Sequence, residues 1–215
     1  MQPVETLNNR IRYDLMIVAS WIDPDSRVLG LGCGEGELLT FLKENKNVKC
    51  TGIEQNETSV TKCIIKGLTV IQGDINKEVN DYPDNSFDYV ILSQTLQQIY
   101  EPAQLIHSML RIGKKGIVSF PNFSHWKIRT QLLLGGKAPI SKQLPYEWHN
   151  TPNIRVITIN DFRQYAGDVG FSILKEAAIN THNEDKSGKT VIRFPNWRAT
   201  YGIFLIGNKT PESSF

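Results

Sequence analysis

A stretch near the start of the chain, residues 28–36, has the residue types and spacing of a ligand-binding turn. It runs Val-Leu-Gly-Leu-Gly-Cys-Gly-Glu-Gly, after a short apolar segment and before one with helical spacing. Glycines let such a turn bend sharply and approach a ligand without a Cβ in the way. The helix behind the turn would present free N–H groups and the positive end of its dipole. The stretch therefore predicts a site for a nucleotide-like ligand.

The spacing of these glycines separates two kinds of nucleotide site. The dinucleotide pattern Gly-x-Gly-x-x-Gly needs a third glycine at position 35 or 37, and both positions hold glutamate. The spacing Gly32-x-Gly34-x-Gly36 instead resembles the first motif of class I S-adenosylmethionine methyltransferases. That resemblance implies that these glycines pass under the amino-acid part of the cofactor. Cys33 lies inside the loop, where no base is positioned to activate it, so we interpret it as a small inert filler. A tight turn without a ligand is the alternative.

Two acidic residues end later strands on the same side of the expected sheet. Glu54, followed by Gln55, ends the second strand, where an acid can accept from both ribose hydroxyls. Asp74, followed by Ile75, ends the third strand. The methyltransferase resemblance implies that Asp74 accepts from the adenine amino group; an Asx-type turn is an equal alternative.

A fourth strand ends at a pair of polar residues, Ser93 and Gln94. Open α/β sheets bind ligands at the carboxyl ends of their strands. We therefore expect Ser93 and Gln94 to complete the cofactor site.

Strands and helices that would position these residues alternate along the chain. We expect strands over 27–31, 48–53, 69–71, 87–92, 116–120, 171–179 and 199–206, and helices over 7–21, 35–44, 58–66, 102–111, 123–134 and 158–169, the last capped by Thr158 or Asn160. Such alternation predicts right-handed crossovers and a parallel sheet covered on both faces. The predicted fold class is α/β, with a doubly wound, mostly parallel, seven-stranded Rossmann-like sheet.

The length of 215 residues fits one domain over 1–215. Residues 135–152 contain three prolines and two glycines, so we expect an irregular loop insertion at about 135–157. The polar stretch 180–198 is expected to be a loop or an irregular excursion, and the tail 207–215 to be frayed.

The overall composition excludes several classes of protein. A net charge of +2 and a pI of about 8.4 are too weak a bias for a nucleic-acid binder. The three cysteines form no Cys-x-x-Cys pair, so we expect neither a disulfide frame nor a metal site. With no apolar run of about 18–20 residues and no signal pattern, we expect a cytoplasmic protein that does not enter a membrane.

Further segments resemble one family, the methionine biosynthesis protein MetW family, between about Arg12 and Ile173. They are residues 91–97, 118–123, 144–148 and 151–154. The resemblance implies a class I methyltransferase-like fold that binds S-adenosylmethionine or S-adenosylhomocysteine. It also implies a role in methionine biosynthesis with homoserine O-acetyltransferase as the partner. An active methyltransferase on a small-molecule acceptor is the alternative.

One position departs from the family pattern. The family carries Asp just before Leu-Gly-x-Gly, whereas this chain has Gly30. A charge-assisted hydrogen bond contributes about 1.5–3 kcal/mol, so losing that carboxylate is expected to weaken cofactor binding about ten- to a hundredfold. Glu35 is a nearby acid that could compensate.

No catalytic residue is defined by the sequence. Methyl transfer can depend largely on positioning, and an acceptor that must lose a proton needs a base near the methyl group. The candidates for that base are His125, Tyr146 and His149. Each is more often a structural or surface residue.

Overall fold

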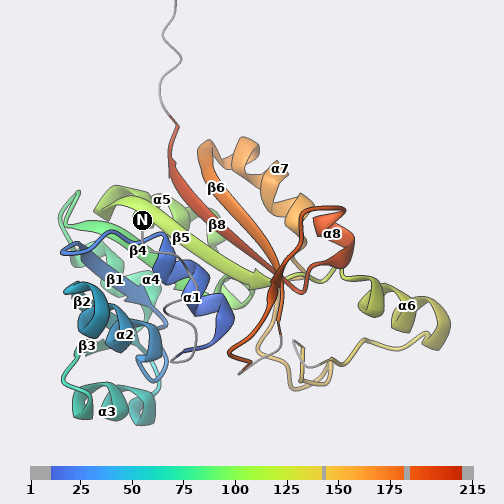
Figure 1. The fold of residues 1–215 in the computed structure, drawn as a ribbon, viewed down its shortest axis with the longest axis horizontal. Helices are drawn as coiled ribbons and strands as arrows, with labels where there is room; N and C mark the ends of the chain where they lie inside the picture. Colours follow the sequence, from blue (N-terminus) through green and yellow to red (C-terminus); the bar gives the residue numbers. More distant parts are fainter. Residues whose placement is uncertain (1–10, 142–143, 182–184, 210–215) are drawn as a thin grey trace, which may run out of the picture.

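An eight-stranded sheet organises the residues that the computed structural model describes, 11–141, 144–181 and 185–209 (Figure 1). The strands lie in the order β3-β2-β1-β4-β5-β8-β6-β7. Those from β1 to β5 are parallel, whereas β8 is antiparallel to β5 and β6, and β7 is antiparallel to β6. The strand bounds are β1 Arg27–Leu31, β2 Lys49–Glu54, β3 Thr69–Gln72, β4 Phe87–Ser93, β5 Gly113–Pro121, β6 Phe171–Asn180, β7 Lys189–Thr190 and β8 Tyr201–Asn208.

Helices cover both faces of this sheet (Figure 1). Their bounds are α1 Tyr13–Ser20, α2 Glu37–Lys46, α3 Glu57–Ile65, α4 Ile75–Glu78, α5 Pro102–Ile112, α6 Trp126–Gly135, α7 Ile159–Val169 and α8 Pro195–Arg198, with short 3-10 turns at Val79–Asp81 and Leu96–Gln98. Figure 1 shows α6 projecting away from the sheet, at the end opposite β2 and β3.

Alternate residues of the central strands enter two separate cores. In β1, Leu29 and Leu31 pack in the core that α5 and α7 share, while Val28 packs in the core of α1 and α2. Because both faces of β1 are covered, this strand is a continuous apolar run rather than an alternating one. The central strands, whose carboxyl ends lie side by side, are therefore packed on both faces.

The predicted fold class is confirmed, with differences near the carboxyl terminus. The stretch 180–198, expected to be irregular, contains α8 and an eighth strand, β7, which pairs with the edge strand β6. Backbone groups at a sheet edge can pair whatever the side chains are, so a polar sequence gives little sign of such a strand. β8 continues through Asn208, past the predicted start of the tail at 207, and residues 7–10 and 210–215 lie outside the described residues.

A long connection joins α6 to α7. The described residues of 136–158 form neither helix nor strand. In the part of the chain that the structure describes, no helix is long and apolar enough to cross a membrane.

Candidate functional site

The loop between β1 and α2 owes its shape to three glycines. Gly32, Gly34 and Gly36 have φ values of +63°, +55° and +74°, a region that other residues enter only with strain. A Cβ on Gly36 would lie 2.4 Å from Leu68 Cδ1, whereas nothing lies within 4 Å of the Cβ position of Gly34. Packing therefore requires a glycine at position 36, while Gly34 faces open space.

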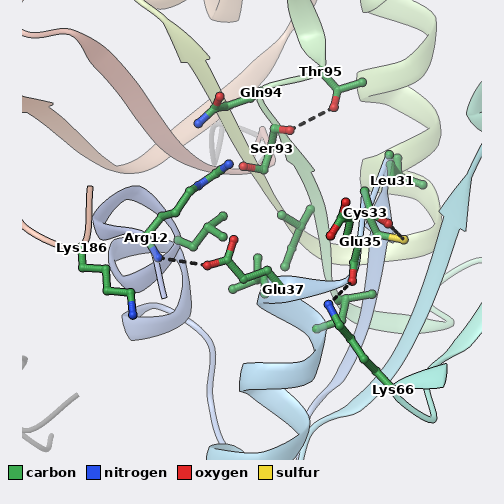
Figure 2. Close-up of a pocket in the computed structure, with 17 residues that line it drawn as sticks. Arg12, Leu31, Cys33, Glu35, Glu37, Lys66, Ser93, Gln94, Thr95 and Lys186 are labelled. Carbon is green, nitrogen blue, oxygen red and sulfur yellow. Dashed lines mark hydrogen bonds between the residues drawn. The ribbon is translucent and has the colours of Figure 1, made fainter. Parts of the chain in front are cut away.

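A cavity of about 750 Å³ opens at this loop, at the carboxyl ends of β1 and β4 and beside α1 (Figure 2). Its volume lies within the range of about 300–1,000 Å³ usual for small-molecule sites. Five of the predicted cofactor residues line it, namely Gly32, Cys33, Gly34, Ser93 and Gln94. The other five, Gly36, Glu54, Gln55, Asp74 and Ile75, are not among its lining residues.

Glu54 contacts the loop from β2. Its Oε2 accepts a hydrogen bond from the Gly34 N–H at 2.8 Å, and its Oε1 accepts from the Asn56 N–H at 2.9 Å. Both carboxylate oxygens therefore bind backbone in this structure. Glu54 fixes the orientation of the glycine loop at the residue that faces the cavity.

Asp74 acts as a helix cap in this structure. Its Oδ1 accepts from the backbone N–H of Asn76 at 3.0 Å and from the Asn76 Nδ2 at 2.9 Å, which caps α4. Ile75 is buried and Gln55 is exposed. The contacts of Asp74 in this structure are therefore those of the Asx-type turn, the alternative to a role in binding adenine.

Charged residues on the α1 side of the cavity were missed by sequence reasoning. Glu37 Oε1 accepts from the backbone N–H of Arg12 at 3.2 Å, and Figure 2 shows the Arg12 side chain extending toward Ser93 and Gln94. The Arg12 guanidinium donates to Asp14, a carboxylate that is only 3% exposed. An acid in the first turn of a helix is ordinary because it favours the helix dipole, so neither Asp14 nor Glu37 stands out in the sequence.

The acid expected to compensate for Gly30 lines the cavity but is already paired with a lysine. Glu35 is exposed and pairs with Lys62 at 2.5 Å, on the rim of the cavity. Lys62 holds the pKa of Glu35 below its usual value. Glu37, two residues later, also lines the cavity and lies beside Arg12.

Gln94 has a strained backbone at the end of β4. Its φ is +52°, unusual for a residue other than glycine. Its N–H donates to the Ser119 carbonyl at 2.8 Å, and its side-chain Nε2 donates to Asp14 Oδ2 at 2.6 Å. Strained residues of this kind cluster at ligand sites. In this backbone conformation the Gln94 side chain reaches Asp14, which is paired with Arg12.

Cys33 is a neutral thiol rather than a nucleophile. Burial, together with the nearby Cys63 and Glu54, raises its pKa to about 12. The thiolate is the reactive form of cysteine, so the raised pKa makes this side chain a poor nucleophile near neutral pH. Among the described residues, no group of three or more His, Cys, Asp or Glu could hold a metal ion.

The three candidate bases lie away from the cavity. His125 is buried and caps α6, its Nδ1 accepting from the Lys127 N–H at 3.3 Å. Tyr146 and His149 are exposed in the segment after α6, and the Nδ1 of His149 lies 3.4 Å from the Oε2 of Glu147. None of the three lines the cavity.

Comparison with known proteins gives the family and the fold. The model of the family described as methionine biosynthesis protein MetW matches residues 12–206, beyond the Ile173 at which the resemblance was expected to end. A curated relative from Rhodopirellula baltica, named bifunctional methionine biosynthesis protein MetXA/MetW, is 34% identical over 164 residues. The match covers 72% of this chain but only 26% of that relative, so the chain spans about a quarter of its length.

Solved structures confirm the methyltransferase fold. An S-adenosylmethionine-dependent methyltransferase from Archaeoglobus fulgidus superposes with a TM-score of 0.66 at 16% identity, covering 95% of this chain and 94% of that one. Another from Thermotoga maritima gives a TM-score of 0.62 at 17% identity, covering 91% and 87%. At such low identity the likeness shows the fold alone, because one fold supports many activities.

Proposed function

This chain belongs to the MetW family of methionine biosynthesis proteins, and on that premise we propose that it binds S-adenosylmethionine or S-adenosylhomocysteine and supports homoserine O-acetyltransferase. The observation that carries the proposal is the open space beside Gly34, in a loop whose glycines leave room for a ligand. The proposed role is that of a ligand-binding partner protein.

The charges around the cavity suit the amino-acid end of that cofactor. A zwitterion needs a cation for its carboxylate and an anion or carbonyl groups for its ammonium. Arg12 and Glu37 lie next to each other in the lining. The guanidinium has five N–H donors, so Arg12 can bind a ligand carboxylate while it also donates to Asp14. Glu37 would face the ammonium in place of the acid absent at position 30.

The remaining predicted residues keep a proposed role at the nucleoside end. Glu54 and Asp74 are both carboxylates at the carboxyl ends of neighbouring strands, β2 and β3. Their present partners are backbone or neighbouring amide groups. We propose that ribose and adenine approach these strands, with Gln55 and Ile75 beside them.

The partner proposal is supported by the MetXA/MetW relative, whose name joins two proteins in a single chain. Domains fused in one chain are held at high effective concentration, which favours pairs that work together. Methyl transfer by this chain alone has less support, because the three candidate bases lie outside the cavity.

Calorimetric titration tests the ligand half of the proposal. We expect both ligands to bind the wild-type protein at micromolar concentration and Gly34→Ala to bind at least about tenfold more weakly, because its Cβ enters the open space and its φ becomes strained. Gly167→Ala is the matched control: Gly167 also has open space around its Cβ position but lies in α7, away from the cavity. If the wild-type protein binds neither ligand at about millimolar concentration, the proposal that it binds this cofactor is wrong.

A further inference from the structure

The segment 126–141, which we call the arm, exposes an unusual amount of apolar surface. It comprises α6 and the residues that follow, and α6 buries only Ile128 (Figure 1). Leu133 and Leu134 are 82% and 85% exposed. Trp126, Leu132 and Ile140 are also large apolar side chains exposed on the arm. Large apolar side chains exposed in this number on one short segment are typical of an interaction site.

A shallow groove lies along the same segment. It has a volume of about 470 Å³ and is lined by the last turns of α6 and by residues 137–140, with Leu134, Pro139 and Ile140 among them. Lys137 lines it as well. The arm therefore offers both a projecting apolar ridge and a recess beside it.

The base of the arm is fixed to the sheet side of the molecule. Asn122 Nδ2 donates to the carbonyl oxygens of Asn196 and Ala199 at 2.9 and 2.8 Å, and Asn196 Nδ2 donates to Ser124 Oγ at 3.1 Å. These bonds tie the residues just before the arm to α8 and to Ala199, which follows it. A surface presented on a fixed base loses less entropy on binding than a free one.

The charge of the arm favours one kind of occupant. It contains three basic residues, Lys127, Arg129 and Lys137, and no acidic residue. A symmetric contact between two copies would bring these like charges together, which is unfavourable. The complementary occupant is an apolar surface bordered by carboxylates on a different protein.

We infer that the arm is the docking surface for homoserine O-acetyltransferase, an inference that rests on the partner half of the proposed function. The family match, residues 12–206, includes the arm, and the MetXA/MetW relative joins the two proteins in one chain. No arm residue lines the cavity at the glycine loop. Docking at the arm therefore leaves that cavity open, and ligand and partner can be bound together.

The test measures binding of the purified acetyltransferase to three forms of the full chain by biolayer interferometry. In the first variant Leu133→Glu and Leu134→Glu are combined. In the control Ile65→Glu changes an apolar residue that is 79% exposed on α3, away from the arm. We expect the double variant to bind about thirtyfold more weakly or worse, and the control to bind like wild type. Circular dichroism and the cofactor titration verify that each variant is folded.

A charge variant gives a second readout. Lys137→Glu is expected to weaken binding and to reduce its dependence on salt, because it removes a cation from the proposed contact. An unchanged salt dependence would argue against a carboxylate-bordered partner surface.

The outcomes separate the surface from the partnership. If wild type and the double variant bind the acetyltransferase equally tightly, the arm is not the docking surface, although the two proteins are partners. If wild type does not bind it, the partnership itself fails and the inference with it. If light scattering shows a wild-type dimer that the double variant dissociates, the occupant is a second copy and the inference is wrong.

Discussion

At the scale of single residues, Glu54 explains how the glycine loop keeps its shape although position 30 has no carboxylate. Its Oε2 holds the Gly34 N–H at 2.8 Å from the neighbouring strand, β2. At position 30 itself, a Cβ would lie 3.2 Å from Leu39 Cδ2 and 3.4 Å from Cys33 Cβ. A side chain there would thus require small shifts in the packing. Orientation of the loop depends on β2 rather than on the last residues of β1.

Cys33 gives a residue-scale prediction about pH. Its folded pKa of about 12 lies above the ordinary value of 9.0. The stability contributed by this shift is fully present below about pH 9 and is lost as the pH rises through the folded pKa. We expect alkylation of Cys33 by iodoacetamide at pH 8.5 to be at least about tenfold slower in the native protein than in denaturant.

Peptide mass spectrometry follows each thiol separately. Cys50, whose pKa burial raises to about 11, serves as an internal comparison. A native Cys33 whose alkylation rate is half-maximal near pH 9 would contradict the prediction, since burial that only hindered access would slow the reaction without moving its pH dependence.

At the scale of elements, α7 shows how a local sequence signal fixes a helix end. The sequence left Thr158 and Asn160 as alternative caps, and the structure selects Thr158. Its Oγ1 accepts from the Asp161 N–H at 3.1 Å, and Asp161 Oδ2 accepts from the Thr158 N–H at 3.1 Å. This reciprocal capping box sets where α7 begins. α7 in turn buries Phe162 against Phe120 and Phe204.

Removing the cap should destabilise the protein measurably. We expect Thr158→Ala to lower the free energy of unfolding by about 1 kcal/mol, because the Asp161 N–H loses its acceptor. For a protein of this size that corresponds to a decrease in Tm of about 2–4 °C. Urea denaturation measures the change, with Asn160→Ala as the control at the exposed alternative position. A larger loss for Asn160→Ala would contradict the assignment.

At the scale of the whole molecule, the cavity is assembled from segments that are distant in sequence. Arg12 precedes α1, Gly34 follows β1, and Gln94 follows β4. A ligand that contacts all three would link the amino-terminal helix to the centre of the sheet. Unfolding would then have to break the ligand contacts as well as both cores.

Ligand binding should therefore raise the thermal stability of the whole chain. At a concentration of about one hundred times Kd, S-adenosylhomocysteine is expected to stabilise the fold by about 2.7 kcal/mol, a rise in Tm of about 5–10 °C. Scanning calorimetry measures it, and Gly34→Ala at the same concentration is expected to show at most about half of that rise, because its Kd is at least about tenfold higher. Equal Tm values with and without ligand would count against binding at the glycine loop.

The sequence by itself determined the family, the α/β fold class and the place of the glycine loop, because hydrophobic periodicity and glycine spacing are local signals. It did not reveal β7, whose pairing is made by backbone at a sheet edge. Only the tertiary structure decided that Arg12 and Glu37 lie together, since 25 residues separate them in sequence. Likewise, only the structure shows that Leu133 and Leu134 project from the molecule, because a core helix and an exposed one can share the same apolar residues.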